Sequence, residues 1–245
     1  NCGGQFAPAI KRCGYDGIFF TGISPKPVYL LIDNDKLELK DAADLWGKDA
    51  VETEELLMHT YGDDARVATI GQSGENLSLI SGVCNDRGRI AARSGLGAVM
   101  GSKKLKALVL KGYKRIAPNN RDEMMGLSQK ANRWVQAGIS LWPGVVNAYM
   151  GWALGIAPVG MAMDGFLYKM LLKQWGTGSM NEMSVGMGDS PIKNWKGSSA
   201  DWGFSKSKSV NSDIFTRCET VKYHCYSCPL GCGGICSLTG KYSET

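Results

Sequence analysis

The sequence predicts an α+β protein with a first domain rich in β-strands and a second domain that is mainly helical. Short apolar runs bounded by turn residues recur up to residue 116, a linker-like break follows at 118–120, and a helical pattern begins at Asp122. We therefore expect domains at residues 1–116 and 117–245. Hydrophobic residues make up 44% of the chain and charged residues 21%, which excludes a disordered chain, a collagen and a coiled coil.

Local patterns predict each element of the first domain in turn. Apolar runs after turns predict strands at 18–21 and 28–32, and the alternation at 36–40 predicts a hairpin partner with one exposed face. Asp49 is a suitable N-cap for a helix over 49–60, which has glutamates in its early turns. Two further strands are expected at 66–70 and 106–110.

The second domain begins with a helix expected over 122–134 and continues into a run without charge. Residues 135–163 contain no charged side chain, and a run of this length could span a membrane. Glycines and prolines interrupt it, so short buried helices or the wall of a pocket are the favoured interpretation, and contact with a membrane surface is the minority one. The aromatic residues of this region suit an apolar substrate pocket and equally an ordinary core.

Charge, glycine content and the chain ends limit the class of protein. A formal net charge of +5 is too small to argue for nucleic acid. The 32 glycines have no fixed period, which indicates turns and close approaches of the main chain. No basic and apolar leader opens the sequence, and a tight cysteine group lies near its last residue. We expect an internal segment of a longer polypeptide, in a reducing, cytoplasmic compartment.

The strongest motif is the cysteine group Cys225-x2-Cys228-Pro-x2-Cys232, which Cys236 follows. One short loop can wrap such thiolates around a single metal centre, and glycines leave its amides near sulfur. Disulfides would need an oxidising compartment, structural zinc normally uses two separated ligand pairs, and free buried cysteines are not expected as a triplet. We favour an iron–sulfur cluster, whose fourth ligand is open between Cys236 and a residue beyond this sequence.

The second motif is the glycine-rich basic segment 85–104, in which small residues are interrupted by cations. Main-chain amides of such a loop can approach an anion while arginine adds charge-assisted hydrogen bonds. The segment lacks the Gly-Lys-Ser/Thr ending of a Walker P-loop, and one Gly-x-Gly is weak evidence for dinucleotide binding. The alternative is a glycine-rich turn feeding a strand, with Lys103, Lys104 and Lys106 on a solvated face. It is less credible for Arg89 and Arg93, which lie four residues apart among small residues.

These motifs resemble the tungsten-containing aldehyde:ferredoxin oxidoreductase family. The resemblance runs in order through residues 1–112, including the opening Asn-Cys-Gly-Gly, the Gly-Gln-Ser-Gly-Glu-Asn at 71–76 and the segment 93–103. It then continues intermittently, through 188–195, to the C-x2-C-x3-C motif, whereas residues 134–185 match poorly. The resemblance implies a sheet-rich first domain that cradles two pyranopterin dithiolenes holding tungsten or molybdenum. It also implies a magnesium ion between the pterin phosphates and a nearby [4Fe–4S] cluster.

The resemblance assigns roles to individual positions. Asn1 and the backbone carbonyl of Ile90 correspond to magnesium ligands. Three of the four cluster ligands correspond to Cys225, Cys228 and Cys232. Pterin-contacting positions fall on Gly3, Arg89 and Ala92, to which the residue pattern adds Arg93. The family has Ala where Ile90 stands, a change that a backbone carbonyl ligand tolerates. It has Gly where Ala92 stands, and we expect the larger alanine to narrow the space beside the pterin.

The function implied by the resemblance is oxidation of an aldehyde to a carboxylic acid, with electrons passed through the cluster to ferredoxin. Two alternatives stay open: a catalytic subunit like that of benzoyl-CoA reductase, which reduces an aromatic thioester, and an electron-transfer module without pterin. Expected partners are a small aldehyde or acyl-CoA, ferredoxin or a ferredoxin-like subunit, and a second copy or a larger redox complex, but not nucleic acid. The family's catalytic acid and base lie beyond this sequence, so no catalytic residue is assigned.

Overall fold

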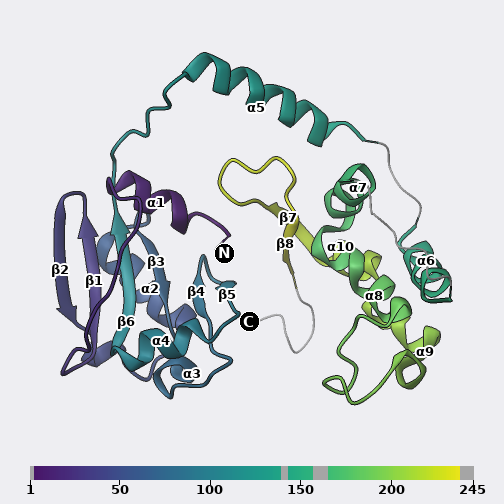
Figure 1. Ribbon diagram of the computed structural model, residues 1–245, viewed down its shortest axis with the longest axis horizontal. Coiled ribbons are helices and arrows are strands. Elements are labelled where there is room, and N and C mark those ends of the chain that lie inside the picture. Colours follow the sequence, from purple (N-terminus) through teal and green to yellow (C-terminus); the bar gives the residue numbers. More distant parts are fainter. Residues whose placement is uncertain (1–2, 139–142, 157–164, 238–245) are drawn as a thin grey trace. The chain divides into compact units, whose positions relative to one another are not determined.

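The computed structural model describes residues 3–138, 143–156 and 165–237, and the chain divides into two compact units, 1–121 and 122–245 (Figure 1). The first unit holds a mixed sheet with helices, and the second is mainly helical with one small hairpin. The predicted α+β class is therefore confirmed.

The first unit is built on a six-stranded sheet of order β2-β1-β6-β3-β4-β5. Strands β1 and β6 are parallel, and the other neighbouring strands pair antiparallel. The strands are β1 (Val28–Asp33), β2 (Lys36–Asp41), β3 (Arg66–Thr69), β4 (Val83–Asn85), β5 (Arg89–Ala91) and β6 (Leu105–Lys111).

Five helical segments accompany this sheet: α1 (Phe6–Arg12), the 3-10 turn η1 (Ala43–Leu45), α2 (Ala50–Tyr61), α3 (Gln72–Glu75) and α4 (Leu96–Ser102). Helix α2 begins as predicted, because the Asp49 carboxylate accepts a hydrogen bond from the Val51 N–H at 2.8 Å. Helices α3 and α4 approach so closely that a Cβ on Gly101 would lie 2.0 Å from the carbonyl oxygen of Gly74. Glycine at these two positions is what allows the contact.

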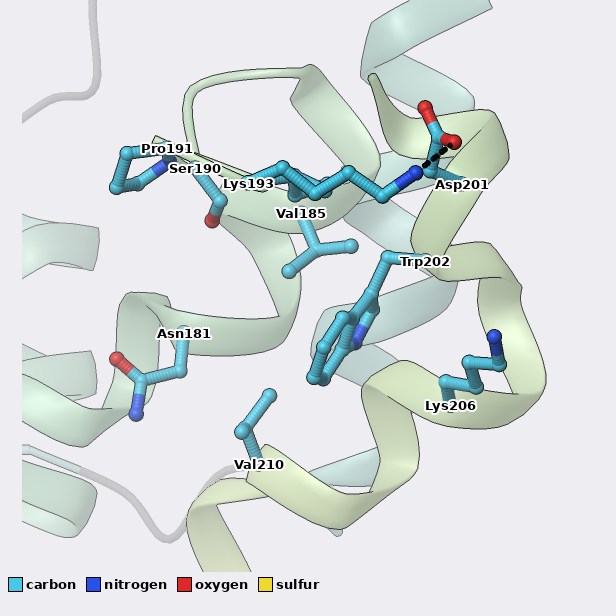
Figure 2. A pocket seen from close by; sticks show the side chains of 10 residues that line it. Asn181, Val185, Ser190, Pro191, Lys193, Asp201, Trp202, Lys206 and Val210 are labelled. Atoms are coloured by element: carbon cyan, nitrogen blue, oxygen red, sulfur yellow. Dashed lines mark hydrogen bonds and ion pairs between the residues drawn. The ribbon is translucent and has the colours of Figure 1, made fainter. Parts of the chain in front are cut away.

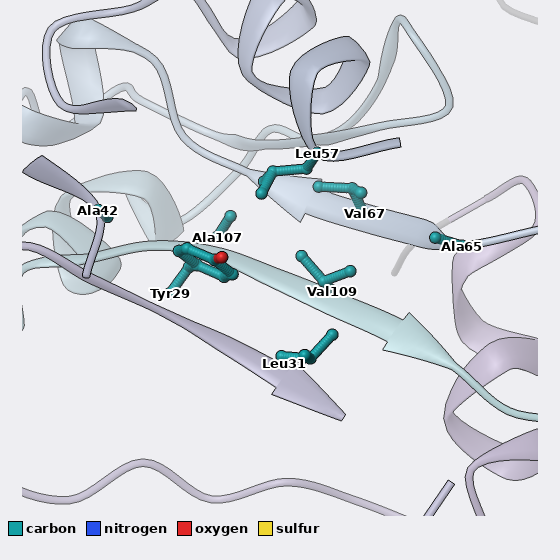
Figure 3. Close-up of a cluster of buried hydrophobic side chains, with 8 residues drawn as sticks. All are labelled: Tyr29, Leu31, Ala42, Leu57, Ala65, Val67, Ala107 and Val109. Atoms are coloured by element: carbon teal, nitrogen blue, oxygen red, sulfur yellow. The ribbon is translucent and has the colours of Figure 1, made fainter. Parts of the chain in front are cut away.

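The central strands bury both of their faces, each against a different helix. On the face toward α2, the core consists of Tyr29, Leu31, Ala42, Leu57, Ala65, Val67, Ala107 and Val109 (Figure 3). On the face toward α1, it consists of Phe6, Ala9, Cys13, Leu30, Ile32, Ala68 and Leu110. Successive residues of a strand point to opposite faces, so β1 needs an unbroken apolar run to fill both cores. This is why 28–32 was recognisable from sequence.

Two predictions about the first strands are wrong. Residues 18–21 form no regular structure: Ile18 and Phe20 pack beside the α1-side core, while Phe19 is 94% exposed. The run gains its burial by packing onto the core, without pairing to a strand. Strand β2 forms where expected, but Leu37 and Leu39 are 52% and 67% exposed. As the sheet's edge strand, β2 lies beyond both cores, so its apolar face is not buried.

The second unit is assembled from short helices and a two-stranded hairpin. Its helices are α5 (Arg121–Gln136), α6 (Val145–Ile156), α7 (Gly165–Trp175), α8 (Asn181–Met187), α9 (Ser199–Ser207) and α10 (Ser212–Cys218), with 3-10 turns η2 (Gly176–Met180) and η3 (Lys208–Val210). The hairpin pairs β7 (Glu219–Tyr223) antiparallel with β8 (Gly233–Cys236). Leu171, Trp175 and Met183 form the buried core of this second unit.

The uncharged run contributes helix α6 to this unit. Asn147, Ala148 and Gly151 of α6 are buried, and a Cβ on Gly151 would lie 2.5 Å from the Met183 carbonyl of α8. Within the run, residues 145–156 therefore form a short packed helix, as favoured from sequence, whereas 139–142 and 157–164 lie outside the described residues. No helix among the described residues combines the length and the apolar character needed to cross a bilayer.

Candidate functional site

The turn that opens the chain is bound to the β4–β5 hairpin. Asn85 Nδ2 donates to the Gly3 carbonyl at 3.1 Å and to Asp86 Oδ2 at 2.9 Å, and Asp86 Oδ2 also accepts the Gln5 N–H at 2.6 Å. Gly4 has φ +90°, and a Cβ there would lie 1.8 Å from the Asp86 carboxylate. Two segments singled out from the sequence, about 80 residues apart, thus meet through a buried amide and a carboxylate.

The hairpin turn itself is in a conformation that side chains disfavour. Asp86 and Arg87 have φ of +49° and +57°, and the Gly88 N–H closes the turn onto the Asn85 carbonyl at 3.3 Å. Consecutive left-handed residues match the right-handed twist of paired strands, but they normally call for Asn, Asp or Gly. An arginine in this position requires support from the surrounding structure.

The predicted pterin and magnesium positions lie along this hairpin and the segment after it. Arg89 is half-buried on β5 and pairs with Asn85, whereas Ile90 is 56% exposed. Ala92 and Arg93 follow β5 and are both exposed. The structure therefore brings Gly3 to the hairpin that bears Arg89 and Ile90. Asn1 lies outside the described residues.

Glu54 lies beneath the hairpin turn and is a residue that sequence reasoning missed. It belongs to α2, is 2% exposed, and its Oε2 accepts the Arg87 N–H at 2.9 Å. Burial raises the pKa of Glu54, and hydrogen bonding to the Arg87 N–H opposes this in part. The early glutamates of α2 were read from sequence only as partners of the helix N-terminus.

A buried ion pair holds the segment 71–76 against the sheet. Lys106 Nζ lies 2.5 Å from Glu75 Oε1 and donates to the Lys48 carbonyl at 2.9 Å. The Lys106 side chain is 0% exposed, although its sequence pattern suggested a solvated lysine. Glu75 Oε2 accepts the Gly47 N–H at 2.8 Å, which ties the loop before α2 to α3.

The three motif cysteines lie on the loop that joins β7 to β8. Cys225, Cys228 and Cys232 are all half-buried, and the Cys228 N–H closes a turn onto the Cys225 carbonyl at 3.1 Å. His224 Nδ1 is 3.0 Å from the Cys228 carbonyl. Gly231, with φ +63°, lies so close to the His224 ring that a Cβ would approach it to 2.4 Å. His224 therefore shapes the loop, and its place directly before the motif was the only sequence signal for that.

Cys232 is held from outside the loop. Its carbonyl accepts the Thr177 N–H at 3.0 Å and the Thr177 hydroxyl at 3.1 Å. Gly176, with φ +64°, leaves room for this contact, because a Cβ there would lie 2.5 Å from the same carbonyl. A pocket of about 420 Å³ adjoins Cys232 and is also lined by Glu219 and Cys236.

Cys236 is separated from the other thiols along the strand. It lies on β8, opposite Glu219 of β7, and is exposed. Its Sγ is 3.8 Å from the Phe215 carbonyl. Cys236 is three residues along the strand from Gly233, and such a step spans about 10 Å of main chain. Among the described residues, no three Cys, His, Asp or Glu side chains are gathered for one metal ion. The donor set of three accessible thiols on one loop nevertheless suits a thiolate-bound cluster.

A pocket of about 610 Å³ in the second unit is framed by side chains of α8, α9, η3 and the loop between α8 and α9 (Figure 2). Val185, Trp202 and Val210 line it, and Lys193 spans one side to pair with Asp201 at 2.7 Å. Residues 193–195 all have positive φ, between +51° and +67°. This loop is the 188–195 stretch recognised in the sequence, but its pocket was not foreseen.

The two candidate sites suit different chemistry. At the hairpin, Arg89 and Arg93 bring guanidinium groups to a segment of small residues, a composition that fits a phosphate-bearing ligand. At the β7–β8 loop, the thiols fit soft metal ions. The hairpin belongs to the first unit and the β7–β8 loop to the second.

Family models match most of the chain. The model for the N-terminal domain of aldehyde ferredoxin oxidoreductase matches residues 1–112, and the model for domains 2 and 3 of the same protein matches residues 163–245. A tungsten-containing aldehyde ferredoxin oxidoreductase of Thermococcus kodakarensis is 32% identical over 241 residues, which are 97% of this chain and 34% of that protein. Its counterpart in Pyrococcus furiosus is 31% identical over 238 residues, covering 96% and 34%.

A solved structure is also similar. The active-site complex BamBC of benzoyl coenzyme A reductase with 1,5-dienoyl-CoA superposes with a TM-score of 0.66 and 29% sequence identity. The match covers 98% of this chain and 34% of the matched chain. The chain thus spans about a third of the length of the relatives it matches.

Proposed function

Since the chain belongs to the aldehyde ferredoxin oxidoreductase family, we propose that it is part of a tungsten-bispyranopterin oxidoreductase that oxidises an aldehyde to a carboxylic acid. In this proposal, electrons leave through a [4Fe–4S] cluster to ferredoxin. The observation that carries it is the contact between Gly3 and the β4–β5 hairpin, because the opening turn then lies beside the strand that bears Arg89.

The hairpin residues would hold the pterin phosphates. Arg89 and Arg93 would donate charge-assisted hydrogen bonds, since the guanidinium fork matches two phosphate oxygens. Gly3 and Ala92 would allow the main chain to approach the pterin. When bound, the metal–pterin centre would supply two-electron chemistry at a single site. The role of these residues is to bind and orient it.

The remaining proposed ligands hold metal ions. Asn1 and the carbonyl of Ile90 would bind magnesium, a hard cation that prefers oxygen ligands. Cys225, Cys228 and Cys232 would supply three thiolates to the cluster. The fourth ligand stays open between Cys236, which lines the same pocket as Cys232, and another residue of the protein.

A second candidate is the catalytic subunit of an enzyme like benzoyl-CoA reductase, which would pass electrons into an aromatic thioester. The structural similarity to BamBC favours it specifically. The two candidates differ in substrate and direction, so anaerobic assays with an aldehyde and an artificial electron acceptor, and with an aromatic acyl-CoA and a low-potential donor, distinguish them. An electron-transfer module without pterin would contain iron and no tungsten.

Metal analysis of four variants tests the residue assignments. Arg89→Ala is expected to lower the affinity for the pterin cofactor by about ten- to a hundredfold, because a hydrogen bond to a charged group contributes roughly 1.5–3 kcal/mol. Tungsten and released pterin per chain should fall as a result. Iron should stay in place, and Arg89→Lys should restore binding only in part. Cys228→Ser should lower iron and the visible absorbance of the cluster. Cys13→Ser, at a buried core position, is the control that leaves iron unchanged.

Two results would contradict the proposal. Wild-type tungsten content in Arg89→Ala would show that this side chain does not hold the cofactor. Unchanged iron per chain in anaerobically purified Cys228→Ser would show that the motif does not bind the cluster.

A further inference from the structure

A buried carboxylate of α2 accepts a hydrogen bond from the turn of the hairpin that bears Arg89. Glu54 reaches from α2 to the strained turn, with its side chain 2% exposed and Oε2 at 2.9 Å from the Arg87 nitrogen. A carboxylate in such a position is unfavourable unless it accepts hydrogen bonds. The hydrogen bond from the Arg87 N–H therefore offsets part of the cost of burying the Glu54 carboxylate.

The turn that Glu54 contacts would not keep its shape on local preferences alone. Asp86 and Arg87 are both left-handed, and arginine has no intrinsic preference for that region. The Asp86 side chain is engaged by the Gln5 N–H on one side, and the Arg87 N–H by Glu54 on the other. These two carboxylates clamp the turn between the opening segment and α2, and thereby set the direction in which β5 leaves it.

We propose that Glu54 is a positioning residue for the cofactor cradle: by fixing the Arg87 N–H, it orients the hairpin so that Arg89 and the Ile90 carbonyl face the pterin. This role rests on the proposed function for its ligand. Arg89 follows the clamped turn by two residues and pairs with Asn85, the same residue that binds Gly3. A rotation of the turn would therefore move both the arginine and the opening turn.

The neighbouring residue Glu55 supplies a matched control. It is exposed, and its Oε1 lies 3.3 Å from Nε of the same Arg87. Two consecutive glutamates thus contact one arginine, one through the buried main chain and the other through a surface ion pair. Surface pairs contribute little to stability, so only the buried contact should matter for the hairpin.

The test compares four variants of the holoprotein. Glu54→Met removes the acceptor but keeps the volume, and Glu54→Gln keeps an amide oxygen for the Arg87 N–H. Glu55→Met is the control, and Glu54→Met/Arg87→Gly relieves the left-handed strain, since glycine adopts that conformation freely. Tungsten per chain is measured in each holoprotein. Amide exchange of residues 85–91 is measured with and without cofactor, with β6 amides as the internal reference.

We expect Glu54→Met to exchange the hairpin amides about tenfold faster, with β6 unchanged, and to retain at least threefold less tungsten. Glu54→Gln and Glu55→Met should match wild type, and the Arg87→Gly background should recover most of both losses. Wild-type exchange in Glu54→Met overturns the positioning role. Faster exchange with full tungsten overturns its link to the cradle. If wild type itself holds no tungsten, the proposed function fails, while the exchange data still decide whether Glu54 holds the hairpin.

Discussion

Replacing Lys106 with methionine tests the buried ion pair that joins β6 to α3. Lys106 Nζ lies 2.5 Å from Glu75 Oε1, and the two side chains are 0% and 5% exposed. Methionine has a similar length and no charge, so the Glu75 carboxylate would keep the Gly47 N–H and lose its counter-ion. The negative charge of Glu75 would then be buried without a counter-ion.

The size of the effect follows from that burial. Removing one partner of a buried pair costs about 3–5 kcal/mol, because the other charge stays desolvated. At ~2.1 cal/mol/K per residue, the 121 residues of the first unit unfold with an entropy of roughly 0.25 kcal/mol/K. A loss of about 4 kcal/mol therefore lowers the Tm of this unit by roughly 16 °C.

Scanning calorimetry of the holoprotein measures this shift against two comparisons. Lys48→Met removes an exposed pair with Glu52, where the side chains are 37% and 50% exposed, and should cost less than about 1 kcal/mol. Lys106→Met/Glu75→Leu removes both charges and should regain most of the stability. A Tm for Lys106→Met within about 3 °C of wild type would refute the reasoning, as would a double variant no more stable than the single one.

Three further substitutions have expected outcomes. Gly101→Ala should destabilise by roughly 1–3 kcal/mol in urea unfolding, because its Cβ would meet a main-chain carbonyl of α3 at 2.0 Å; Gly126→Ala, whose Cβ would meet nothing within 4 Å, should not. Burial raises the pKa of Glu182 above its ordinary value, so its contribution to stability is present at low pH and is lost as pH rises through the folded-state pKa. Glu182→Gln should flatten that fall, and an unchanged slope of unfolding free energy against pH would contradict this. Thr177→Val removes one of two bonds to the Cys232 carbonyl and should lower iron per chain, whereas wild-type iron would show that the loop needs no such support.

The central strands were predictable because their burial is written into local patterns. Residues 28–32 and 107–110 face cores on both sides of the sheet, so their apolar runs are continuous. The Asp49 cap is equally local, since it involves a residue two positions away. Helix α1 and the β4–β5 hairpin were missed, because each is short and depends on packing or pairing with distant segments.

The sequence alone determined the class of fold, the cysteine motif and the arginines of the glycine-rich segment, because residue type and spacing carry that chemistry. Only the tertiary structure decided which of these residues meet. Gly3 reaches the hairpin through Asn85, 82 positions away, and Glu54 supports a turn 33 positions away. Lys106 changed from a presumed surface lysine to a buried ion pair. Such contacts depend on how the sheet brings distant segments together, and no local pattern records that.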